Sequence, residues 1–412
     1  MKAVVFTLGC KVNECESDSL IASLIERGYE VSDKLVPADL YIVNTCAVTA
    51  EAEKKSRQTA SRIRKLSKTA KIIFTGCAVQ KAAKPFIEKD PDFLVTGVFN
   101  KNKILEMLDK SGVEISPETK QFEELATVKS LRTRAYVKVQ DGCNNFCSYC
   151  IIPYLRGRSR SRNPQSVIDE IKAVNPKEAV INGINLSAYD FEGMKLAGLM
   201  SKLKGLPTRI RLGSLEVGVI TDEFLTAVKE LDDFAPHFHL SLQSGSNAVL
   251  KKMNRHYTAE EYAEKVDLIR KYFPDAGITT DIIVGFPTET EEDFLDTVKL
   301  IQRVNFSDIH PFPFSPRSGT VAFKMKDLPP EVKKERLGVL LKIKERQKTA
   351  FAESMLNKTL DVILEEEKDG YCVGYSENYL RVYVKADGLE PSKKVKVKAT
   401  EPFLDGVVAQ II

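Results

Sequence analysis

Short apolar runs alternate with helical stretches along the first hundred residues, and this alternation limits the fold more than any other feature of the chain. A strand, helix, strand, helix order is typical of a parallel sheet with helices on its faces. We therefore predict an α/β, doubly wound parallel-sheet domain at the N-terminal end. The predicted strands are 4–8, 40–43 and 72–74, and the predicted helices are 14–27, 50–66 and one that begins near 85–89.

A longer alternation of the same kind starts at residue 135. A run of six strand-helix units suggests a partial or complete barrel, a (β/α)6 arrangement whose chemistry lies at the carboxyl ends of the strands. Pro329 and Pro330 then open a basic helix that extends to about residue 350. The predicted strands are 135–140, 179–182, 209–213, 237–242, 278–284 and 307–312, and the predicted helices include 164–173, 221–231, 259–272 and 291–304.

The chain changes character after residue 350. Short β-branched runs separated by Gly, Asp, Asn or Pro predict a small antiparallel β-barrel of about five strands, at 360–365, 371–375, 380–384, 394–399 and 407–411. The segment 109–133 lacks clear periodicity and is interpreted as a linker. The predicted domains are an N-terminal domain (1–112), a linker (113–132), a central domain (133–350) and a C-terminal barrel (351–412).

Composition and hydropathy argue against a membrane protein. Of the 412 residues, 43% are hydrophobic and 29% are charged. No apolar run approaches the roughly 18 residues that a membrane span needs. The first residues also lack the apolar stretch of a signal peptide, so we expect a cytoplasmic protein.

Basic residues are segregated along the chain, although the net charge is only +4. Residues 54–71 hold eight basic and no acidic side chains, whereas residues 129–172, which include Lys129 and Arg132, hold nine basic and three acidic ones. The rest of the chain therefore carries a net charge of −10. Segregated positive charge is what a polyanion-binding face requires.

Three of the eight cysteines follow the first three predicted strands, at Cys10, Cys46 and Cys77. Each could be a small buried residue near a strand end, as free cysteine often is. However, the loops after parallel strands open into one crevice, where ligands bind. Thiols at three equivalent positions therefore favour a shared metal centre, and a reducing cytosol favours metal over disulfides. Cys15 lies outside this pattern.

A second group of thiols, Cys143, Cys147 and Cys150, follows the first strand of the predicted barrel. Three thiolates can bind three irons of a cubane cluster and leave the fourth iron without a protein ligand. An open metal position is typical of a catalytic site. A zinc knuckle is the alternative, but zinc sites usually pair two CxxC elements or add a nearby histidine, and the next histidine is His237.

These motifs resemble the radical S-adenosylmethionine methylthiotransferase family, and the resemblance covers nearly the whole chain. CxxxCxxC at the head of a barrel resembles the radical S-adenosylmethionine superfamily, and the terminal barrel resembles the TRAM RNA-binding domain. The other stretches that carry the resemblance are Thr-Leu-Gly-Cys-Lys-Val-Asn at 7–13, Asn-Thr-Cys at 44–46, Thr-Gly-Cys at 75–77, and the segments 153–162, 240–246, 281–289 and 312–320.

The resemblance implies two [4Fe-4S] clusters and the cosubstrate S-adenosylmethionine. The cluster at Cys143, Cys147 and Cys150 would cleave S-adenosylmethionine to a 5′-deoxyadenosyl radical. The auxiliary cluster at Cys10, Cys46 and Cys77 would carry the sulfur that is delivered as methylthio. Such a reaction needs an electron donor, such as a flavodoxin or ferredoxin, and a sulfur source.

The resemblance also implies positions for the cosubstrate contacts. Tyr149 would lie beside the adenine, while Asn182 and Gly183 would meet the methionyl end. Ser214 and Glu216 would bind the ribose or the amine. Gln243 and Gly285 follow the fourth and fifth barrel strands. Polar residues at strand ends also cap helices, so a structural role stays open for each of these positions.

The basic run downstream of the second cysteine group predicts contacts to RNA phosphates beside an extruded purine. Its arginines are Arg156, Arg158, Arg160 and Arg162, although an Arg-rich run is often only a solvated surface. In the terminal barrel, Lys394 and Lys396 lie near several tyrosines and predict a further RNA surface. Residues 350–412 nevertheless hold eight bases against eleven acids, so this surface must be one-sided.

The motif around Cys10 bears on the substrate. Gly-Cys-Lys-Val-Asn is similar to the branch that acts on N6-threonylcarbamoyladenosine at position 37 of tRNA, in the anticodon stem-loop. The isopentenyladenosine branch more often has Gly-Cys-Gln-Met-Asn, and the branch that modifies an aspartate of ribosomal protein S12 has Gly-Cys-Pro-Lys-Asn. We expect N6-threonylcarbamoyladenosine in tRNA to be the substrate. The alternatives are another branch of the family, or an iron-sulfur RNA-binding protein without catalysis.

Overall fold

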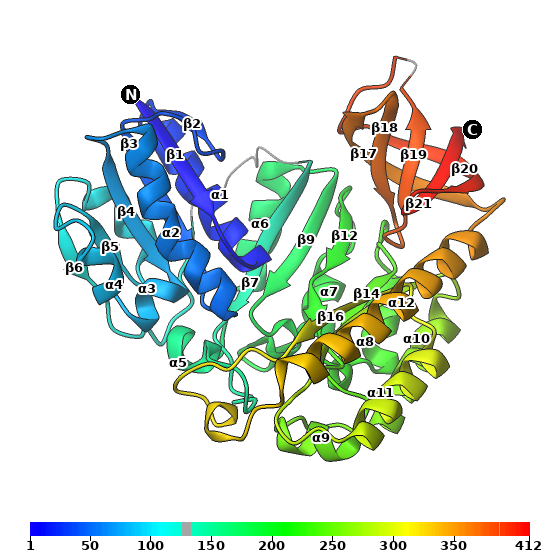
Figure 1. Ribbon diagram of the computed structural model, residues 1–412. Coiled ribbons are helices and arrows are strands. Elements are labelled where there is room, and N and C mark those ends of the chain that lie inside the picture. The colour runs from blue at the N-terminus through cyan, green and yellow to red at the C-terminus, as the bar shows by residue number, and fades with distance from the viewer. Residues whose placement is uncertain (126–132, 387) are drawn as a thin grey trace.

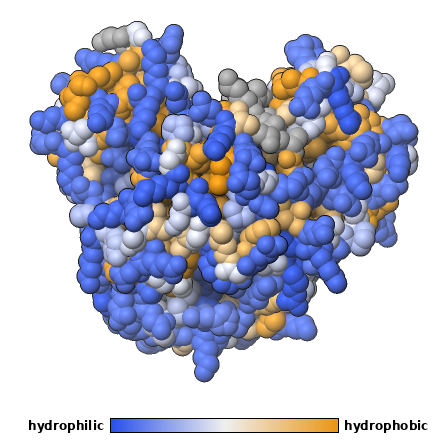
Figure 2. Space-filling view, turned by 180° about the vertical axis from the view of Figure 1, so that it is seen from behind, coloured by the Kyte–Doolittle hydropathy of each residue, from blue (hydrophilic) through white to orange (hydrophobic). Residues whose placement is uncertain are grey.

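The computed structural model describes residues 1–125, 133–386 and 388–412. A six-stranded parallel sheet, a central partial barrel and a closed five-stranded barrel follow one another along the chain, and the predicted fold class is confirmed. In Figure 1 the N-terminal sheet and the C-terminal barrel lie on either side of the central domain. From behind, an indentation separates these two lobes, and most of the surface is hydrophilic (Figure 2). No helix in the described parts of the chain is long and apolar enough to cross a membrane.

The N-terminal sheet has the order β2-β1-β3-β4-β5-β6, and all of its strands are parallel. Every residue of β3 is buried because helices cover both faces of the sheet. Thr49 starts α2 by accepting a hydrogen bond from the backbone of Ala52. The elements are β1 (Lys2–Thr7), α1 (Lys11–Glu26), β2 (Glu30–Ser32), β3 (Leu40–Thr45), α2 (Ala50–Leu66), β4 (Lys71–Gly76), α3 (Cys77–Lys81), α4 (Lys84–Ile87), β5 (Leu94–Thr96) and β6 (Gly112–Glu114).

The central domain curves six main parallel strands around one apolar core. Capping boxes begin two of its helices, at Thr258 with Glu261 and at Thr290 with Asp293. Its strands are β7 (Arg134–Asp141), β8 (Arg160–Ser161), β9 (Glu178–Gly183), β10 (Asp190–Phe191), β11 (Met194–Lys195), β12 (Arg209–Leu212), β13 (Ser214–Leu215), β14 (His237–Leu240), β15 (Gly277–Val284) and β16 (Asp308–Pro313). Its helices are α5 (Ile152–Arg156), α6 (Pro164–Val174), α7 (Leu196–Lys202), α8 (Asp222–Lys229), α9 (Asn247–Lys252), α10 (Ala259–Tyr272), α11 (Glu291–Val304) and α12 (Pro330–Ser354).

Arginine side chains of the central domain bind the C-terminal barrel through hydrogen bonds and an ion pair. Arg209 and Arg211 are buried and donate hydrogen bonds to the backbone carbonyls of Asp361 and Ser376, at 3.0 and 3.1 Å. Arg134 pairs with Glu365 of the barrel. The barrel closes in the order β17-β18-β19-β21-β20. Its strands are β17 (Thr359–Lys368), β18 (Tyr371–Ser376), β19 (Arg381–Lys385), β20 (Lys394–Phe403) and β21 (Gly406–Ile411).

Three elements of the sequence interpretation lie partly or wholly outside the described residues. Lys129 and Arg132 of the second basic block fall in 126–132, as does part of the predicted linker. The domain boundaries at 112, 132 and 350 stay predictions. The long helix α12 continues to Ser354.

Candidate active site between two thiol triads

The first thiol triad lies at the carboxyl ends of three neighbouring parallel strands. Cys46 and Cys77 come directly after β3 and β4, and Cys10 follows β1 after two residues. Gly9 has a φ of +109°, and a Cβ there would lie 2.8 Å from Cys46 Sγ, so the two loops are in close contact. Burial, with smaller contributions from the neighbouring Cys77 and Cys10, raises the pKa of the Cys46 thiol to about 12. The topology therefore brings together the three thiols that the sequence pattern predicted.

The second triad lies on one tight loop after β7. Gly142 opens the loop with a φ of +72°, where a Cβ would lie 2.0 Å from the carbonyl oxygen of Arg158. The backbone N–H of Cys143 donates to the carbonyl of Gly157 at 3.0 Å, and that of Cys150 donates to the carbonyl of Cys147 at 2.9 Å. Burial raises the pKa of Cys150 to about 12. All three thiols line one cavity of about 170 Å³.

The donor sets fit cubane clusters better than single ions. No three His, Cys, Asp or Glu groups among the described residues converge tightly enough to hold one metal ion. A cubane cluster binds each thiolate through a different iron, so its ligands lie farther apart than those of a single ion. Each triad offers three thiols, which is the donor set for three of the four irons of a cubane cluster.

Most of the predicted cosubstrate residues lie around the second triad. Tyr149, Ser214, Glu216 and Gln243 line the 170 Å³ cavity with the three thiols. Asn182 and Gly183 line the adjoining larger cavity, which Ser214 also borders.

Gly285 borders neither of these two cavities. Its backbone N–H donates to Glu289 Oε1 at 3.0 Å, and Lys333 occupies the space where a Cβ would be. Its φ is +68°, a backbone conformation that other residues rarely adopt, so the backbone itself requires a glycine here.

Three residues around this cavity were not singled out from the sequence. Arg255 Nη1 lies 2.7 Å from Glu216 Oε1 and donates to Cys147 Sγ at 3.4 Å. Asn145 Nδ2 donates to the same Glu216 oxygen at 2.6 Å, and Asn185 Nδ2 donates to Cys143 Sγ at 3.8 Å. Asn185 and Arg255 follow β9 and α9 without a motif that would mark them. Together they hold the Glu216 carboxylate beside the thiols.

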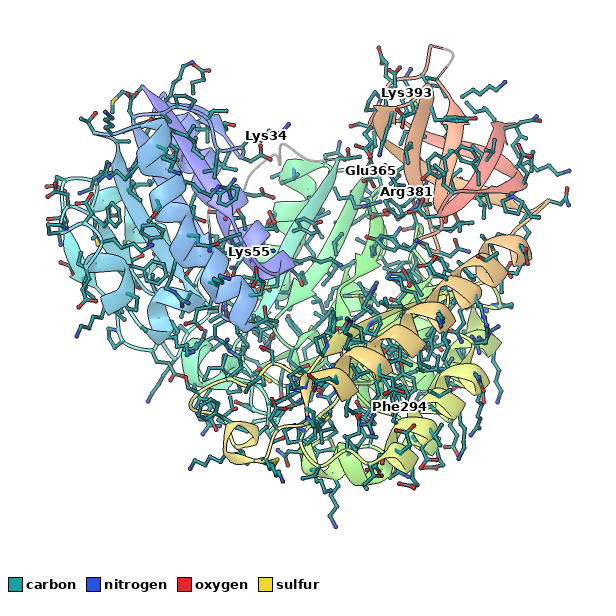
Figure 3. The ribbon with its side chains drawn as sticks, in the orientation of Figure 1. Lys34, Lys55, Phe294, Glu365, Arg381 and Lys393 are labelled. Atoms are coloured by element: carbon teal, nitrogen blue, oxygen red, sulfur yellow. The ribbon has the colours of Figure 1, made fainter. Side chains whose placement is uncertain are left out.

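A larger cavity of about 780 Å³ lies where the three domains meet. Cys10 of the first triad and Cys150 of the second both line it, so it adjoins both thiol sites. The barrel contributes Tyr375 and Tyr379, whose rings stack with centroids 4.6 Å apart. It also contributes Arg381, on the side that faces the central domain (Figure 3). This cavity can receive a planar ring between the two thiol sites.

Lys11 also lines the large cavity and is exposed to it. Burial lowers the pKa of its ammonium, and Arg211 and Arg134 lower it further.

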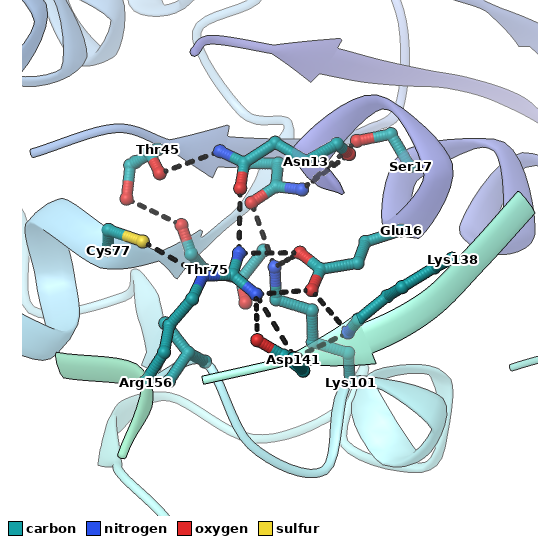
Figure 4. Close-up of polar contacts among 12 residues, drawn as sticks. Asn13, Glu16, Ser17, Thr45, Thr75, Cys77, Lys101, Lys138, Asp141 and Arg156 are labelled. Atoms are coloured by element: carbon teal, nitrogen blue, oxygen red, sulfur yellow. Dashed lines mark hydrogen bonds and ion pairs between the residues drawn. The ribbon is translucent and has the colours of Figure 1, made fainter. Parts of the chain in front are cut away.

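A buried charge network contacts the first triad at Cys77 and joins the N-terminal domain to the central one (Figure 4). Arg156 Nη1 lies 2.8 Å from Glu16 Oε1 and 3.1 Å from Asp141 Oδ1, and its Nε donates to Cys77 Sγ at 3.4 Å. Lys138 lies 2.9 Å from Glu16, and Lys101 also pairs with it. Burial would raise the pKa of Glu16, but Arg156, Lys101 and Lys138 lower it well below its usual range.

This network corrects the predicted RNA contacts. Arg156, Arg160 and Arg162 are at most 8% exposed, because acids and carbonyls inside the protein occupy their guanidinium groups. They are structural in this fold and are not available to phosphates. Only Arg158 of the predicted four is exposed, and its guanidinium lies 4.6 Å from the ring centroid of Phe146.

Two exposed basic surfaces remain as candidates for RNA. In the barrel, Lys396 is exposed, whereas Lys394 Nζ pairs with Asp233 Oδ2 at 2.5 Å. Helix α2 presents a basic face, and Figure 3 marks one of its residues, Lys55. The exposed bases on and just after this helix are Lys54, Lys55, Arg62, Lys65 and Lys68.

Comparison with known proteins matches this architecture. The model of the Radical SAM superfamily matches residues 137–301, and that of Uncharacterized protein family UPF0004 matches residues 2–97. The chain is similar to a solved radical S-adenosylmethionine methyltransferase, TsrM, from Kitasatospora setae, with a TM-score of 0.54 at 14% identity, covering 76% of this chain and 74% of that one. At this identity the likeness supports the fold alone.

Curated relatives extend the similarity to the whole chain. The threonylcarbamoyladenosine tRNA methylthiotransferase MtaB of Bacillus subtilis is 37% identical over 100% of this chain and 97% of its own length. The protein of the same name from Thermotoga maritima is 38% identical over 99% and 97%. A tRNA-2-methylthio-N(6)-dimethylallyladenosine synthase of Thermoanaerobacter pseudethanolicus is 37% identical over 87% and 81%.

Proposed function

The chain belongs to the radical S-adenosylmethionine methylthiotransferase family, and we propose that it converts N6-threonylcarbamoyladenosine at position 37 of tRNA into its 2-methylthio derivative. One observation carries this proposal: relatives named for that activity align over the full length of the chain, including the terminal barrel. The cavity between the two thiol triads is consistent with it, since a purine placed there would lie close to both.

Enzymes of this family use S-adenosylmethionine and two [4Fe-4S] clusters. We assign the radical-generating cluster to Cys143, Cys147 and Cys150, and the auxiliary cluster to Cys10, Cys46 and Cys77. When bound, the two clusters supply reductive cleavage of S-adenosylmethionine and storage of the transferred sulfur. Glu216 would bind the cosubstrate from the wall of the 170 Å³ cavity, where Arg255 and Asn145 fix its carboxylate.

The RNA would enter with its target base turned out of the anticodon stem-loop. Tyr375 and Tyr379 both line the large cavity, so they offer an aromatic wall beside an extruded purine. The basic face of α2, together with Arg158 and Lys396, would contact phosphates. An electron donor of the flavodoxin or ferredoxin type, a sulfur source and a cytoplasmic location belong to the same proposal.

Mass spectrometry of tRNA nucleosides from a deletion strain tests the proposal. We expect 2-methylthio-N6-threonylcarbamoyladenosine to disappear and unmodified N6-threonylcarbamoyladenosine to accumulate. Complementation with the wild-type gene should restore the product, and complementation with the Cys46→Ala variant should not. An unchanged amount of the 2-methylthio nucleoside would refute the proposal.

A second substrate is supported by the relative named for dimethylallyladenosine, which is 37% identical over most of the chain. The same measurement separates the two substrates. Loss of the 2-methylthio dimethylallyl nucleoside, with the threonylcarbamoyl nucleoside unchanged, would favour this alternative.

A further inference from the structure

The charged residues that line the 780 Å³ cavity are almost all paired. Asp405 accepts from Arg381 at 3.1 Å and lies 3.5 Å from Lys348. Asp281 lies 3.3 Å from His239. Asp308 pairs with Lys344 at 3.3 Å. The lining acids and two of the three lining Lys and Arg side chains therefore have partners.

Lys11 is the exception in this cavity. Within the described part of the chain, its ammonium has neither an ion pair nor a hydrogen bond, although it lies on the cavity wall. Burial lowers the pKa of His237 and of His310, so these imidazoles add no competing positive charge at neutral pH. An unpaired cation on the wall of a substrate cavity is a site for an anion.

The position of Lys11 on the cavity wall indicates which anion it could bind. Lys11 lines the large cavity but not the 170 Å³ cavity beside Cys143, Cys147 and Cys150, so the carboxylate of S-adenosylmethionine is not its natural partner. It directly follows Cys10 and is the first residue of α1, whose N-terminal dipole favours negative charge on the same side. The anion should therefore lie on the side of the cavity next to Cys10, where the proposed auxiliary cluster would carry the transferred sulfur.

The proposed substrate carries such an anion in a suitable position. The threonylcarbamoyl group is attached at N6 and ends in a carboxylate. In the purine ring, C2 and C6 flank N1, so the group on N6 shares the Watson–Crick edge with C2, where the methylthio group is added. A residue beside the sulfur-delivering site can therefore reach the substituent while C2 faces that site.

We propose that Lys11 binds the carboxylate of the threonylcarbamoyl group and so selects this substrate from neutral N6-substituted adenosines. This inference rests on the proposed function. Losing a hydrogen bond to a charged group should cost about tenfold to hundredfold in affinity. The loss should be confined to the carboxylate-bearing substrate, because a neutral substituent has no charge to pair with Lys11.

The test compares two anticodon stem-loops with anaerobically reconstituted protein. One stem-loop carries N6-threonylcarbamoyladenosine and the other its neutral threoninamide counterpart. Dissociation constants come from fluorescence anisotropy, and product from single-turnover mass spectrometry. We expect the wild-type protein to prefer the carboxylate by about tenfold or more, the Lys11→Met variant to lose the preference, and Lys11→Arg to retain it.

The controls separate this role from a structural one. Iron and sulfide contents should match the wild type, and Lys11→Gln replaces the Met variant if the latter loses iron. Lys202→Met, an exposed change at the end of α7, should bind both stem-loops as the wild type does. A Lys11→Met variant that keeps the preference overturns the inference, as does one that weakens both stem-loops equally, which indicates a phosphate contact.

A further outcome identifies failure of the proposed function itself. If wild-type protein modifies a dimethylallyl stem-loop and leaves the threonylcarbamoyl one unmodified, the substrate assignment is wrong. If it modifies the threonylcarbamoyl stem-loop and Lys11→Met discriminates normally, only the role of Lys11 is wrong.

Discussion

The two thiol triads are built in different ways. Cys143, Cys147 and Cys150 lie on one loop, and backbone hydrogen bonds from Cys143 and Cys150 shape it. Cys10, Cys46 and Cys77 follow three separate strands, so their spacing depends on the register of a parallel sheet. The auxiliary triad also touches the buried charge network through Cys77 and Arg156. The triad of Cys143, Cys147 and Cys150 needs only local structure, whereas the triad of Cys10, Cys46 and Cys77 needs the packing of two domains.

The sharpest test of this contrast removes one thiol from each triad. Cys46→Ala should abolish methylthio transfer but leave 5′-deoxyadenosine formation, since the second triad is intact. Cys147→Ala should abolish both. Product and 5′-deoxyadenosine are measured by mass spectrometry in the same anaerobic reaction. Loss of both activities in Cys46→Ala would indicate that the two sites do not function separately.

Glu16→Gln should lower the free energy of unfolding far more than substitution of an exposed glutamate does. It leaves Arg156, Lys101 and Lys138 buried without their shared carboxylate, at an expected cost of about 3–5 kcal/mol in the free energy of unfolding. The matched control is Glu30→Gln, in an exposed pair with Lys2, for which we expect less than about 1 kcal/mol. Urea unfolding of the metal-free full-length chain measures both. Equal losses would contradict a structural role for the network.

Acid should weaken the same network. Burial raises the pKa of Asp141, but Lys138 and Arg156 lower it more, to about 2 in the folded state. Folding therefore favours the ionised carboxylate, which contributes about 2–3 kcal/mol above pH 4. This contribution is lost as the pH falls from about 4 through 2. Urea unfolding at several pH values in this range should show a smaller pH dependence for Asp141→Asn, and an unchanged dependence would refute the assignment.

The smallest expected effect is a change in S-adenosylmethionine affinity at the second triad. Glu216→Gln removes the carboxylate that Arg255 and Asn145 hold, and should weaken S-adenosylmethionine binding about tenfold. Isothermal titration calorimetry of the reconstituted protein measures this change. Iron bound by the auxiliary triad should not change, and the exposed variant Glu230→Gln should bind as the wild type does. Loss of iron from both sites would show that Glu216 acts on folding.

Sequence patterns predicted the longer elements well, because apolar runs and helix caps are local signals. Strand β15 was predicted at 278–284 and runs over Gly277–Val284, and helix α2 was predicted at 50–66 and is Ala50–Leu66. Strands β5 and β6, each of three residues, were missed because so short a segment has no measurable period.

The site was predicted in part, for the same reason. A cysteine after each strand is visible in the sequence, and so is CxxxCxxC. The burial of Arg156 is not visible, because its partner Glu16 lies 140 positions away. Charge along a chain does not distinguish an exposed arginine from one that is buried against distant acids. In the sequence Lys11 is visible only as part of the motif around Cys10, since its lack of a partner among the described residues is a property of the folded cavity.

The attachment of the C-terminal barrel has a consequence for RNA recognition. Arg134, Arg209 and Arg211 bind the barrel to the central domain, and Tyr379 stacks on His237 at 4.5 Å. The aromatic wall of the cavity is therefore preorganised before RNA arrives. The conformational entropy of placing that wall is lost during folding and not on each binding event. Discrimination between modified adenosines then depends on fit to a fixed receptor, without closure of a mobile clamp.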